Sequence, residues 1–199
     1  MTTPTLDYYN TNSNSFYIGT VSADMSQVRD RFLTRLSTGA YIMDLGCGSG
    51  RDTKAFIDAG YRVDAVDGSE ELCRLASRLT GQTVKHMLFR DLDENNKYDG
   101  IWACASLLHM RKSELPDMLA RCYAALKMGG YIYLSFKYGT FEGERNGRYF
   151  TDLDQDSFAK ITAASGAAFE TADEWISGDA RAGRENEKWL NVILRKTCS

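Results

Sequence analysis

The 199-residue sequence contains only two histidines, and its five cysteines include no pair in the C-x-x-C spacing. Cysteine and histidine are the usual ligands of structural zinc, so this set disfavours a zinc site. An odd number of scattered cysteines also favours reduced thiols over a disulfide framework. We therefore expect no metal ion, and most of the cysteines are predicted to be buried as small apolar side chains.

An excess of basic charge, a secretory leader and a membrane-spanning run are also missing. The net charge is −3, whereas nucleic-acid-binding proteins usually carry a basic face and a high pI. The most apolar run, residues 101–110, is far shorter than the roughly 20 residues that a membrane helix needs. These absences predict a cytoplasmic protein without a membrane or DNA partner, and they disfavour RNA. The length fits one domain over residues 1–199, in an oligomeric state that the sequence leaves open.

From residue 40 onward, short apolar runs typical of strands alternate with segments of helical periodicity. Strands are predicted over residues 40–45, 61–66, 82–91, 98–106, 131–138, 167–176 and 187–196. Helices are predicted over residues 22–36, 53–60, 69–81, 112–130 and 154–165, and a loop over 139–150. This alternation indicates an α/β fold, with a parallel sheet covered by helices on both faces and a closing antiparallel hairpin at one edge.

The stretch IMDLGCGSGRD, residues 42–52, places Gly46, Gly48 and Gly50 directly after the first strand. Glycines at a strand-to-helix turn let the backbone approach a ligand closely, at the edge of the sheet where ligands bind. Arg51 stands where the dinucleotide fingerprint needs its third glycine, and no Gly-Lys pair forms a phosphate loop. The loop therefore indicates an adenosine ligand without a pyrophosphate.

Acidic residues follow the next two strands. Asp67 ends the second strand, about 20 residues beyond the glycines, where an acid typically binds ribose hydroxyls. Asp91 and Leu92 end the third predicted strand and could meet the amine and the ring face of an adenine. The alternative for each aspartate is an ordinary turn residue, because aspartate is common in turns and at strand ends.

Five motifs together resemble those of class I S-adenosylmethionine-dependent methyltransferases. They are DLGCGSG, AVDGS, FRDL, YDGIWACASLLHM and ALKMGGYIYLSF, and the resemblance covers residues 38–137. Met128 is a departure, since it stands where the family commonly has proline. The resemblance implies a Rossmann-like sheet of seven strands in the order 3-2-1-4-5-7-6 with strand 7 antiparallel. It makes residues 38–199 the core and residues 1–37 a lid or helical segment.

The resemblance also implies a cofactor, S-adenosylmethionine, with S-adenosylhomocysteine as the product. Asp44 is then expected near the methionine end of the cofactor, above a floor made by the three glycines. Asp67 is expected at the ribose, and Asp91 at the adenine. The expected neighbours of these groups are Gly68 and Ser69 beside the adenosine, Leu92 at the adenine, and Ala105 and Ser106 at the sulfonium and methyl group.

Two residues have open roles at this stage. Arg51, in GSGRDT, resembles the glycine-rich stretch of the tellurite-resistance group of these methyltransferases. It either pairs with the cofactor carboxylate or simply opens the following helix. His109, in SLLHM, is the best candidate for a general base, since histidine accepts a proton near neutral pH. Its alternative is to orient a loop or contact the substrate.

The substrate is expected to be a small molecule. The Asn/Asp-Pro-Pro-Tyr/Phe motif of amino-base methyltransferases is missing after the fourth strand, which disfavours a DNA base. Tyr8 and Tyr9 are candidates for a lid over the site. The candidate substrate-binding cations are Arg145, Arg148, Arg181 and Arg184. If these arginines converge, the substrate is acidic or an oxyanion; neighbouring glutamates make solvated ion pairs the alternative.

Four other functions compete with a small-molecule methyltransferase. A non-catalytic adenosine-binding module would bind the cofactor without turnover. An NAD-dependent oxidoreductase is disfavoured by Arg51. An RNA methyltransferase would show a steep salt dependence of RNA binding. A methyltransferase for a metalloid oxyanion of the tellurite type is the remaining alternative.

Overall fold

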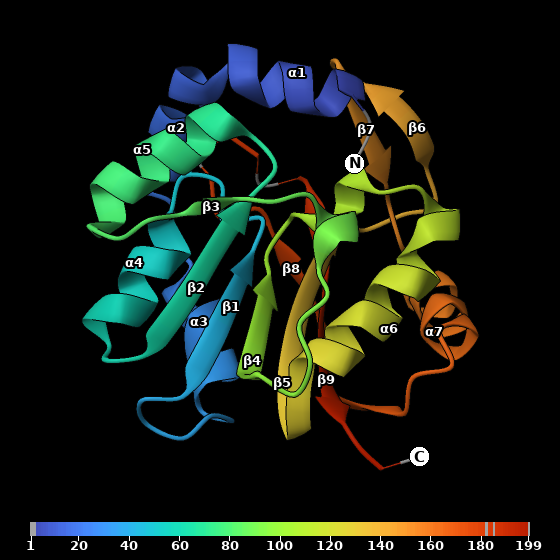
Figure 1. The fold of residues 1–199 in the computed structure, drawn as a ribbon. Coiled ribbons are helices and arrows are strands. Elements are labelled where there is room, and N and C mark those ends of the chain that lie inside the picture. The colour runs from blue at the N-terminus through green and yellow to red at the C-terminus, as the bar shows by residue number, and fades with distance from the viewer. Residues whose placement is uncertain (1–2, 182, 185, 199) are drawn as a thin grey trace.

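A sheet of seven strands runs through the middle of the protein, in the order β3-β2-β1-β4-β5-β9-β8 (Figure 1). The computed structural model describes residues 3–181, 183–184 and 186–198. The sheet consists of β1 (Tyr41–Leu45), β2 (Arg62–Asp67), β3 (Lys85–His86), β4 (Tyr98–Ala103), β5 (Leu126–Lys137), β8 (Phe169–Gly178) and β9 (Lys188–Lys196). The strands β1 to β5 are parallel, and β9 runs antiparallel to both of its neighbours. With β8 and β9 as strands six and seven, the predicted order and fold class are confirmed.

Helices surround the sheet and connect most of its strands. They are α1 (Thr3–Thr11), α2 (Ser13–Thr20), α3 (Ser26–Leu33), α4 (Arg51–Asp58), α5 (Glu70–Thr80), α6 (Leu115–Ala125) and α7 (Gln155–Ala164). Short 3-10 turns are η1 (Phe89–Asp91), η2 (Leu107–His109) and η3 (Lys112–Glu114). Within the described residues, no helix has the length and apolar character to cross a bilayer.

The two faces of the sheet carry different helices because side chains alternate along each strand. Met43, Ile101 and Leu134 belong to the apolar cluster that contains the buried residues of α6 and α7. Ile42 and Trp102 belong to a second cluster, which contains the aromatic residues of α3 and α4. A third cluster packs α5 against β2. Burial of the strands on both faces accounts for their continuous apolar runs.

Capping residues set several helix ends as their sequence signals predict. The Ser69 hydroxyl accepts a hydrogen bond from the Leu72 N–H at 3.2 Å and starts α5. Gly81 ends that helix in a left-handed conformation. The Asp154 carboxylate accepts from the Ser157 N–H at 2.8 Å and starts α7. Each cap satisfies backbone groups that have no partner within the helix.

Two predicted helix boundaries are wrong. The helix predicted over residues 22–36 is only α3, which begins at Ser26, where the Asp24 carboxylate accepts from the backbone N–H. The helix predicted over residues 112–130 ends at Ala125. Leu126 is extended and fully buried, and it pairs with β4 as the first residue of β5. A local hydrogen bond therefore marks the start of α3, whereas tertiary packing overrides local helix propensity at the end of α6.

The strand predicted over residues 82–91 is also largely wrong. Only β3 pairs with β2, and the chain then forms the 3-10 turn η1. Phe89 begins this turn, Leu92 directly follows it, and both are almost completely buried. The apolar residues of this segment therefore reach the core from a turn and not from a long strand.

The loop predicted over residues 139–150 contains a hairpin. β6 (Glu142–Arg145) and β7 (Arg148–Thr151) form a separate antiparallel sheet. Asn146 and Gly147 join them with φ values of 50° and 74°. Positive φ at both central residues suits the twist of a two-residue hairpin, and Asn-Gly is the dipeptide that most readily adopts it. The sequence thus contained a signal for this hairpin.

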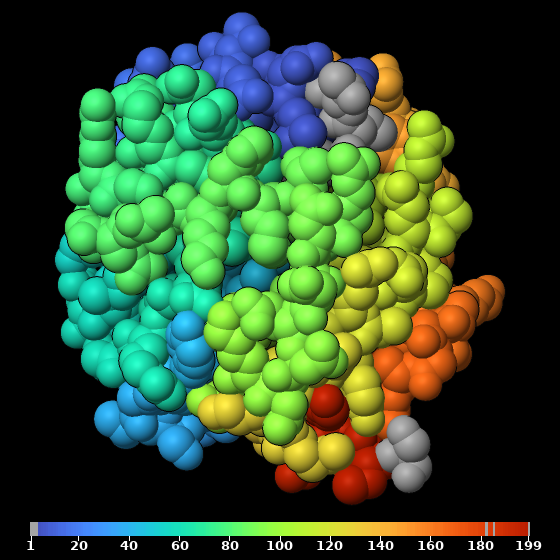
Figure 2. Space-filling view, in the orientation of Figure 1, coloured from blue at the N-terminus to red at the C-terminus, as the bar shows by residue number. Residues whose placement is uncertain are grey.

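The amino-terminal segment forms α1 and α2, although its sequence has little periodicity. Figure 1 shows α1 across the top of the molecule, beyond the arrowheads of β1, β2 and β4. In Figure 2 the blue atoms of this segment lie directly against the green atoms of α5. The Ser69 hydroxyl donates to the Asn10 side chain at 2.7 Å, and the Thr5 hydroxyl accepts from the Tyr149 N–H at 2.9 Å. Side-chain contacts therefore hold α1 over the carboxyl ends of the strands.

We expect Gly100→Ala to destabilise the protein by roughly 1–3 kcal/mol through overpacking. A Cβ atom at this position in β4 would lie 2.7 Å from the Phe32 ring and 2.9 Å from Leu36. Both contacts are too short, so α3 must shift. Urea denaturation of the variant measures the change.

Gly19→Ala is the matched control, since nothing lies within 4 Å of the corresponding Cβ atom in α2. Alanine is the better helix former, so this variant should be unchanged or more stable by up to about 1 kcal/mol. Equal stability losses in the two variants would contradict the packing described between β4 and α3.

Candidate active site

A cavity of about 920 Å³ lies at the carboxyl ends of β1, β2 and β4, next to α1 and α2. Ligands of open α/β sheets bind at this edge. The predicted site residues that line the cavity are Tyr9, Asp44, Gly46, Gly48, Arg51, Asp67, Gly68, Ala105, Ser106, His109, Arg145, Arg148, Arg181 and Arg184. The structure thus brings together residues that are far apart in the sequence.

The remaining predicted residues lie outside the cavity wall; they are Tyr8, Gly50, Ser69, Asp91 and Leu92. Gly50 precedes the first residue of α4 and Ser69 caps α5. Leu92 is buried in the core, whereas Asp91 is exposed and lies 3.9 Å from Arg90. The 3-10 turn η1 contains Asp91 and is followed by Leu92. Its first residue, Phe89, lines the cavity.

Residues that the sequence analysis did not select also line the cavity. Phe89 and Ser135 are two of them. The Ser135 hydroxyl, on β5, accepts from the Ala105 N–H at 2.8 Å. A signal for each was present: Phe89 directly precedes the Arg-Asp-Leu motif, and Ser135 is the polar residue within a strongly apolar strand.

Close packing explains why two of the three glycines in the loop after β1 cannot carry a side chain. Gly46 has a φ of 83°, and a Cβ atom there would lie only 2.6 Å from that of Ser106. Gly50 has a φ of 79°, and its Cβ atom would lie 2.9 Å from that of Ala76 in α5. A side chain at either position would meet both backbone strain and a collision. The loop after β1 therefore passes tightly between the loop after β4 and α5.

Asp67 connects the loop after β1 to the loop after β2. One carboxylate oxygen accepts from the Gly48 N–H and the other from the Ser69 N–H, both at 2.8 Å. The side chain is buried, and burial raises the pKa of the carboxyl despite these two hydrogen bonds. The backbone donors hold the carboxylate in one orientation at the edge of the cavity.

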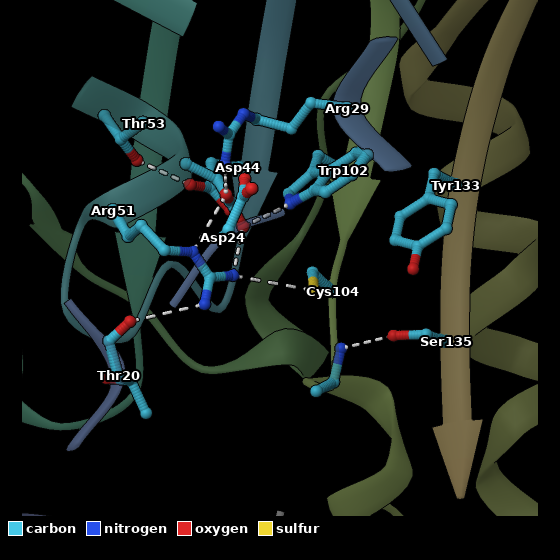
Figure 3. A network of polar contacts seen from close by, with 12 residues as sticks. Thr20, Asp24, Arg29, Asp44, Arg51, Thr53, Trp102, Cys104, Tyr133 and Ser135 are labelled. Carbon is cyan, nitrogen blue, oxygen red and sulfur yellow. Dashed lines mark hydrogen bonds and ion pairs between the residues drawn. The ribbon is translucent and has the colours of Figure 1, made fainter. Parts of the chain in front are cut away.

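A network of charged side chains lies beside the glycine loop (Figure 3). The buried Asp52 carboxylate accepts from Nε and Nη2 along one edge of the Arg51 guanidinium, at 3.0 and 2.6 Å. It also accepts from Arg29 at 2.8 Å and from the Trp102 ring N–H at 3.0 Å. Burial would raise the pKa of Asp52, but the two guanidinium groups outweigh it and lower the pKa. The network joins α3, α4 and β4.

Asp44 lies at the edge of this network, and the pKa of its carboxyl is raised, whereas that of Asp52 is lowered. Burial and the nearby charge of Asp52 raise the pKa of its carboxyl to about 8. The Thr53 hydroxyl donates to it at 2.5 Å. Asp44 therefore takes up a proton near neutral pH, whereas Asp52 stays ionised.

Arg51 is the first residue of α4, as one of its two predicted roles requires. Figure 3 shows its guanidinium between Thr20 and Cys104. Because Asp52 already neutralises its charge, any anion in the cavity shares Arg51 with that carboxylate. Its predicted contact with a cofactor carboxylate stays a prediction.

His109 is buried and uses both ring nitrogens. Its Nδ1 donates to the Tyr149 carbonyl oxygen at 2.7 Å, because a carbonyl only accepts. Nε2 is then the acceptor and takes a hydrogen bond from the Tyr9 hydroxyl at 2.7 Å. Burial lowers the pKa of His109 to about 4, so the ring is neutral at neutral pH. A base role for His109 therefore works through the Tyr9 hydroxyl.

The turn after β4 shows local strain. Ala105 has a φ of 51°, in the left-handed region that residues with a Cβ atom rarely adopt. The next residue, Ser106, is buried, and its hydroxyl oxygen has no hydrogen-bond partner among the described residues. Such features cluster at functional sites.

The four arginines predicted to bind the substrate differ in whether a carboxylate of the protein neutralises their charge. Arg145 lies 2.6 Å from Asp152, Arg181 lies 2.5 Å from Asp179, and Arg184 lies 3.3 Å from Glu187. Arg148 has no ion pair with any residue that the structure describes. In the described part of the chain, three of these arginines thus form ion pairs, but only Arg184 pairs with a neighbouring glutamate as the alternative expected; Arg145 and Arg181 pair with aspartates whose side chains are buried. The described residues contain no cluster of three or more metal-ligating acids, cysteines or histidines.

The fold and this cavity define an α/β protein with its ligand site at the carboxyl ends of the central strands. Residues 42–130 match a family model described as a methyltransferase domain. This match confirms the resemblance to S-adenosylmethionine-dependent methyltransferases over this region, and it agrees with the predicted cofactor.

Curated relatives match only part of the chain. The N-terminal Xaa-Pro-Lys N-methyltransferase 1 of Xenopus tropicalis is 30% identical over 102 residues, which are 47% of this chain and 46% of that protein. The ubiquinone biosynthesis O-methyltransferase of Xanthomonas campestris pv. campestris is 30% identical over 107 residues, 49% of this chain and 43% of that protein. The match thus spans less than half the length of either relative.

A solved structure matches nearly the whole chain in its fold. The 1,6-didemethyltoxoflavin-N1-methyltransferase of Burkholderia thailandensis, crystallised with 1,6-didemethyltoxoflavin and S-adenosylhomocysteine, gives a TM-score of 0.76 at 22% identity. The match covers 96% of this chain and 85% of that one. At this identity the likeness establishes the fold alone.

We expect His109 to make stability fall in acid. The pKa of His109 is lowered from 6.5 to about 4 in the folded protein. Between these values the unfolded chain binds a proton that the folded protein excludes, so the free energy of unfolding decreases as the pH falls through this window. Denaturation at several pH values should show a smaller decrease for His109→Gln than for the wild type.

His86→Gln is the control, because His86 is exposed on β3. This variant should keep the wild-type decrease. A decrease in His109→Gln as large as that of the wild type would mean that the buried, neutral state of His109 is incorrect.

Proposed function

We propose that the protein is an S-adenosylmethionine-dependent methyltransferase that acts on a small polar or anionic molecule by in-line methyl transfer. The methyltransferase domain over residues 42–130 and the fold shared with a methyltransferase that binds S-adenosylhomocysteine support this function. The observation that carries the proposal is the Ser106 hydroxyl, which is buried at the cavity next to Gly46 and has no hydrogen-bond partner among the described residues. A buried polar group of this kind calls for a ligand.

The cavity residues fit the parts of this cofactor. Each oxygen of Asp67 keeps a free lone pair for a ribose hydroxyl, since it accepts only one backbone N–H. The Asp44 carboxyl offers oxygens to the ammonium of an amino-acid tail, whose positive charge would favour the ionised form of Asp44. Arg51 offers N–H groups to the carboxylate of that tail. We propose Phe89, which lines the cavity, as a neighbour of the adenine. The predicted adenine contacts of Asp91 and Leu92 stay predictions.

S-adenosylmethionine supplies a methyl group that is already activated on a sulfonium. The protein therefore needs mainly to orient the nucleophile and to exclude water. Ala105 and Ser106 form the turn at the predicted reaction centre, and Ser135 fixes this turn through the Ala105 N–H. Tyr9 and Phe16 line the cavity from α1 and α2 and shield it from solvent.

A nucleophile that must lose a proton can pass it to Tyr9. The Tyr9 oxygen then gives its own proton to Nε2 of His109, which is 2.7 Å away. The ring becomes an imidazolium whose Nδ1 still donates to the Tyr149 carbonyl. Because burial disfavours that charge, this relay suits acceptors that are already acidic or that carry a negative charge.

Other acceptors and functions have less support. A cavity of about 920 Å³ has the size of a small-molecule site, which favours a small acceptor over RNA or a polypeptide. A non-catalytic adenosine-binding module does not need a buried Tyr9–His109 pair. A metalloid oxyanion is one of the anions that we propose to test as acceptors. We propose a cytoplasmic location, with which the five free thiols agree.

The first test is binding of S-adenosylhomocysteine, followed by calorimetry and by the melting temperature. We expect saturable binding that stabilises the wild type. Asp67→Asn should weaken it roughly 10- to 100-fold, as expected for hydrogen bonds to a charged acceptor worth about 1.5–3 kcal/mol. The melting temperature of the ligand-free variant identifies any separate folding defect.

Asp58→Asn provides the control, since this exposed residue of α4 pairs only with Lys54. It should bind like the wild type. Failure of the wild type to bind the ligand at millimolar concentration would refute the proposed function. Binding without release of the demethylated product from any acceptor tested would favour the non-catalytic module.

A further inference from the structure

Arg148 occupies a distinct position in the cavity wall. It is the first residue of β7, in the hairpin that stands outside the main sheet. Its guanidinium carbon lies 4.4 Å from the ring centre of Tyr8, 5.8 Å from that of Tyr9 and 5.1 Å from that of Phe150. Three aromatic rings therefore surround this cation and restrict its movement.

The other cations on this wall are neutralised within the protein. Arg145, Arg181 and Arg184 pair with the carboxylates of nearby acids. Lys137 pairs with Glu187, which it shares with Arg184. An anion that bound to any of them would have to compete with a carboxylate that is already in place.

Arg148 has no such partner in the part of the chain that the structure describes. Its one hydrogen bond to a described residue is long, from Nη1 to the Tyr9 hydroxyl at 3.5 Å. Its Nε is buried and has no acceptor among the described residues. A buried donor on a charged group is costly when it is left unpaired. The aromatic rings attract the cation, but they provide no lone pair for this N–H.

We infer that Arg148 binds the acidic group of the methyl acceptor, and that this group is a carboxylate or a phosphate. The Nε–H and a terminal N–H of a guanidinium point the same way, so they bind two oxygens of such a group side by side. This assignment rests on the proposed function and defines the class of its substrate. Arg148 is then the residue that selects acids over their neutral analogues.

The location of Arg148 couples this selection to the proposed proton transfer. Tyr9 contacts both Arg148 and His109, at 3.5 and 2.7 Å. An acidic acceptor held by Arg148 therefore brings its negative charge next to the Tyr9–His109 pair. That charge offsets the positive charge of Arg148, which otherwise opposes protonation of His109.

The test uses benzoate, phenyl phosphate and the neutral analogue benzamide as probes, since aromatic rings line this part of the cavity. Each probe is titrated into protein saturated with S-adenosylhomocysteine. Calorimetry gives the affinity, and the side-chain Nε–H signal of Arg148 in the NMR spectrum reports direct contact. Loss of that signal in Arg148→Met assigns it.

We expect at least one of the two acids to bind at least tenfold more tightly than benzamide and to shift the Arg148 signal. Arg148→Met should lose this difference, and Arg148→Lys should keep only part of it, because lysine has the charge without the paired N–H groups. The acid that binds distinguishes a carboxylate from a phosphate site. Arg74→Met, which removes an exposed cation of α5 paired with Glu71, should behave like the wild type.

Three results would overturn the inference: equal binding of acids and benzamide, unchanged binding of the acids by Arg148→Met, or no saturable binding of either acid. Binding of S-adenosylhomocysteine is measured on the same samples. Its retention in any of these cases would leave the proposed methyltransferase function intact and reject only the role of Arg148.

Discussion

The buried carboxylate of Asp52 is the interaction on which the geometry of the site depends. It binds Arg29 of α3, Arg51 of α4 and the ring N–H of Trp102 in β4. Two cations and an indole would each lose a partner without it, and an unpaired buried charge is far more costly than a missing surface ion pair. The network fixes two helices against the central strand, and so it fixes the loop after β1 that forms the floor of the cavity.

Protonation differs across the site because burial and charge act differently on each group. Asp52 stays ionised between two guanidinium groups, whereas Asp44 has only a hydroxyl donor and a raised pKa. His109 is neutral because it is buried beside Arg148. The end of the cavity at Arg51 and Asp52 is therefore rich in charge. The Tyr9–His109 end is largely neutral apart from Arg148.

Local signals in the sequence predicted the alternation of strands and helices, and the resemblance to class I methyltransferases implied the strand order that the structure confirms. Most residues predicted for the cofactor site line the cavity, and their contacts with a cofactor stay predictions. Alternating strands and helices define the sheet, and glycines and aspartates at strand ends carry the site. The sequence did not predict the short length of β3 or the early start of β5. Burial of Phe89 and Leu126 outweighs local propensity at these two places. Nor did the sequence distinguish Arg148 from the other arginines. That difference depends on which carboxylates the fold brings within reach.

The position of α1 and of the β6–β7 hairpin outside the alternating sheet separates part of the cavity wall from the main sheet. Together they supply Tyr9, Arg145 and Arg148 to the cavity, while the methyltransferase-domain match spans only residues 42–130. Substitutions in these two peripheral segments can therefore change the side chains of this part of the cavity wall without disturbing the strands beneath. One wall of the cavity is thus adjustable in size and charge, while the sheet that carries the opposite wall keeps its packing.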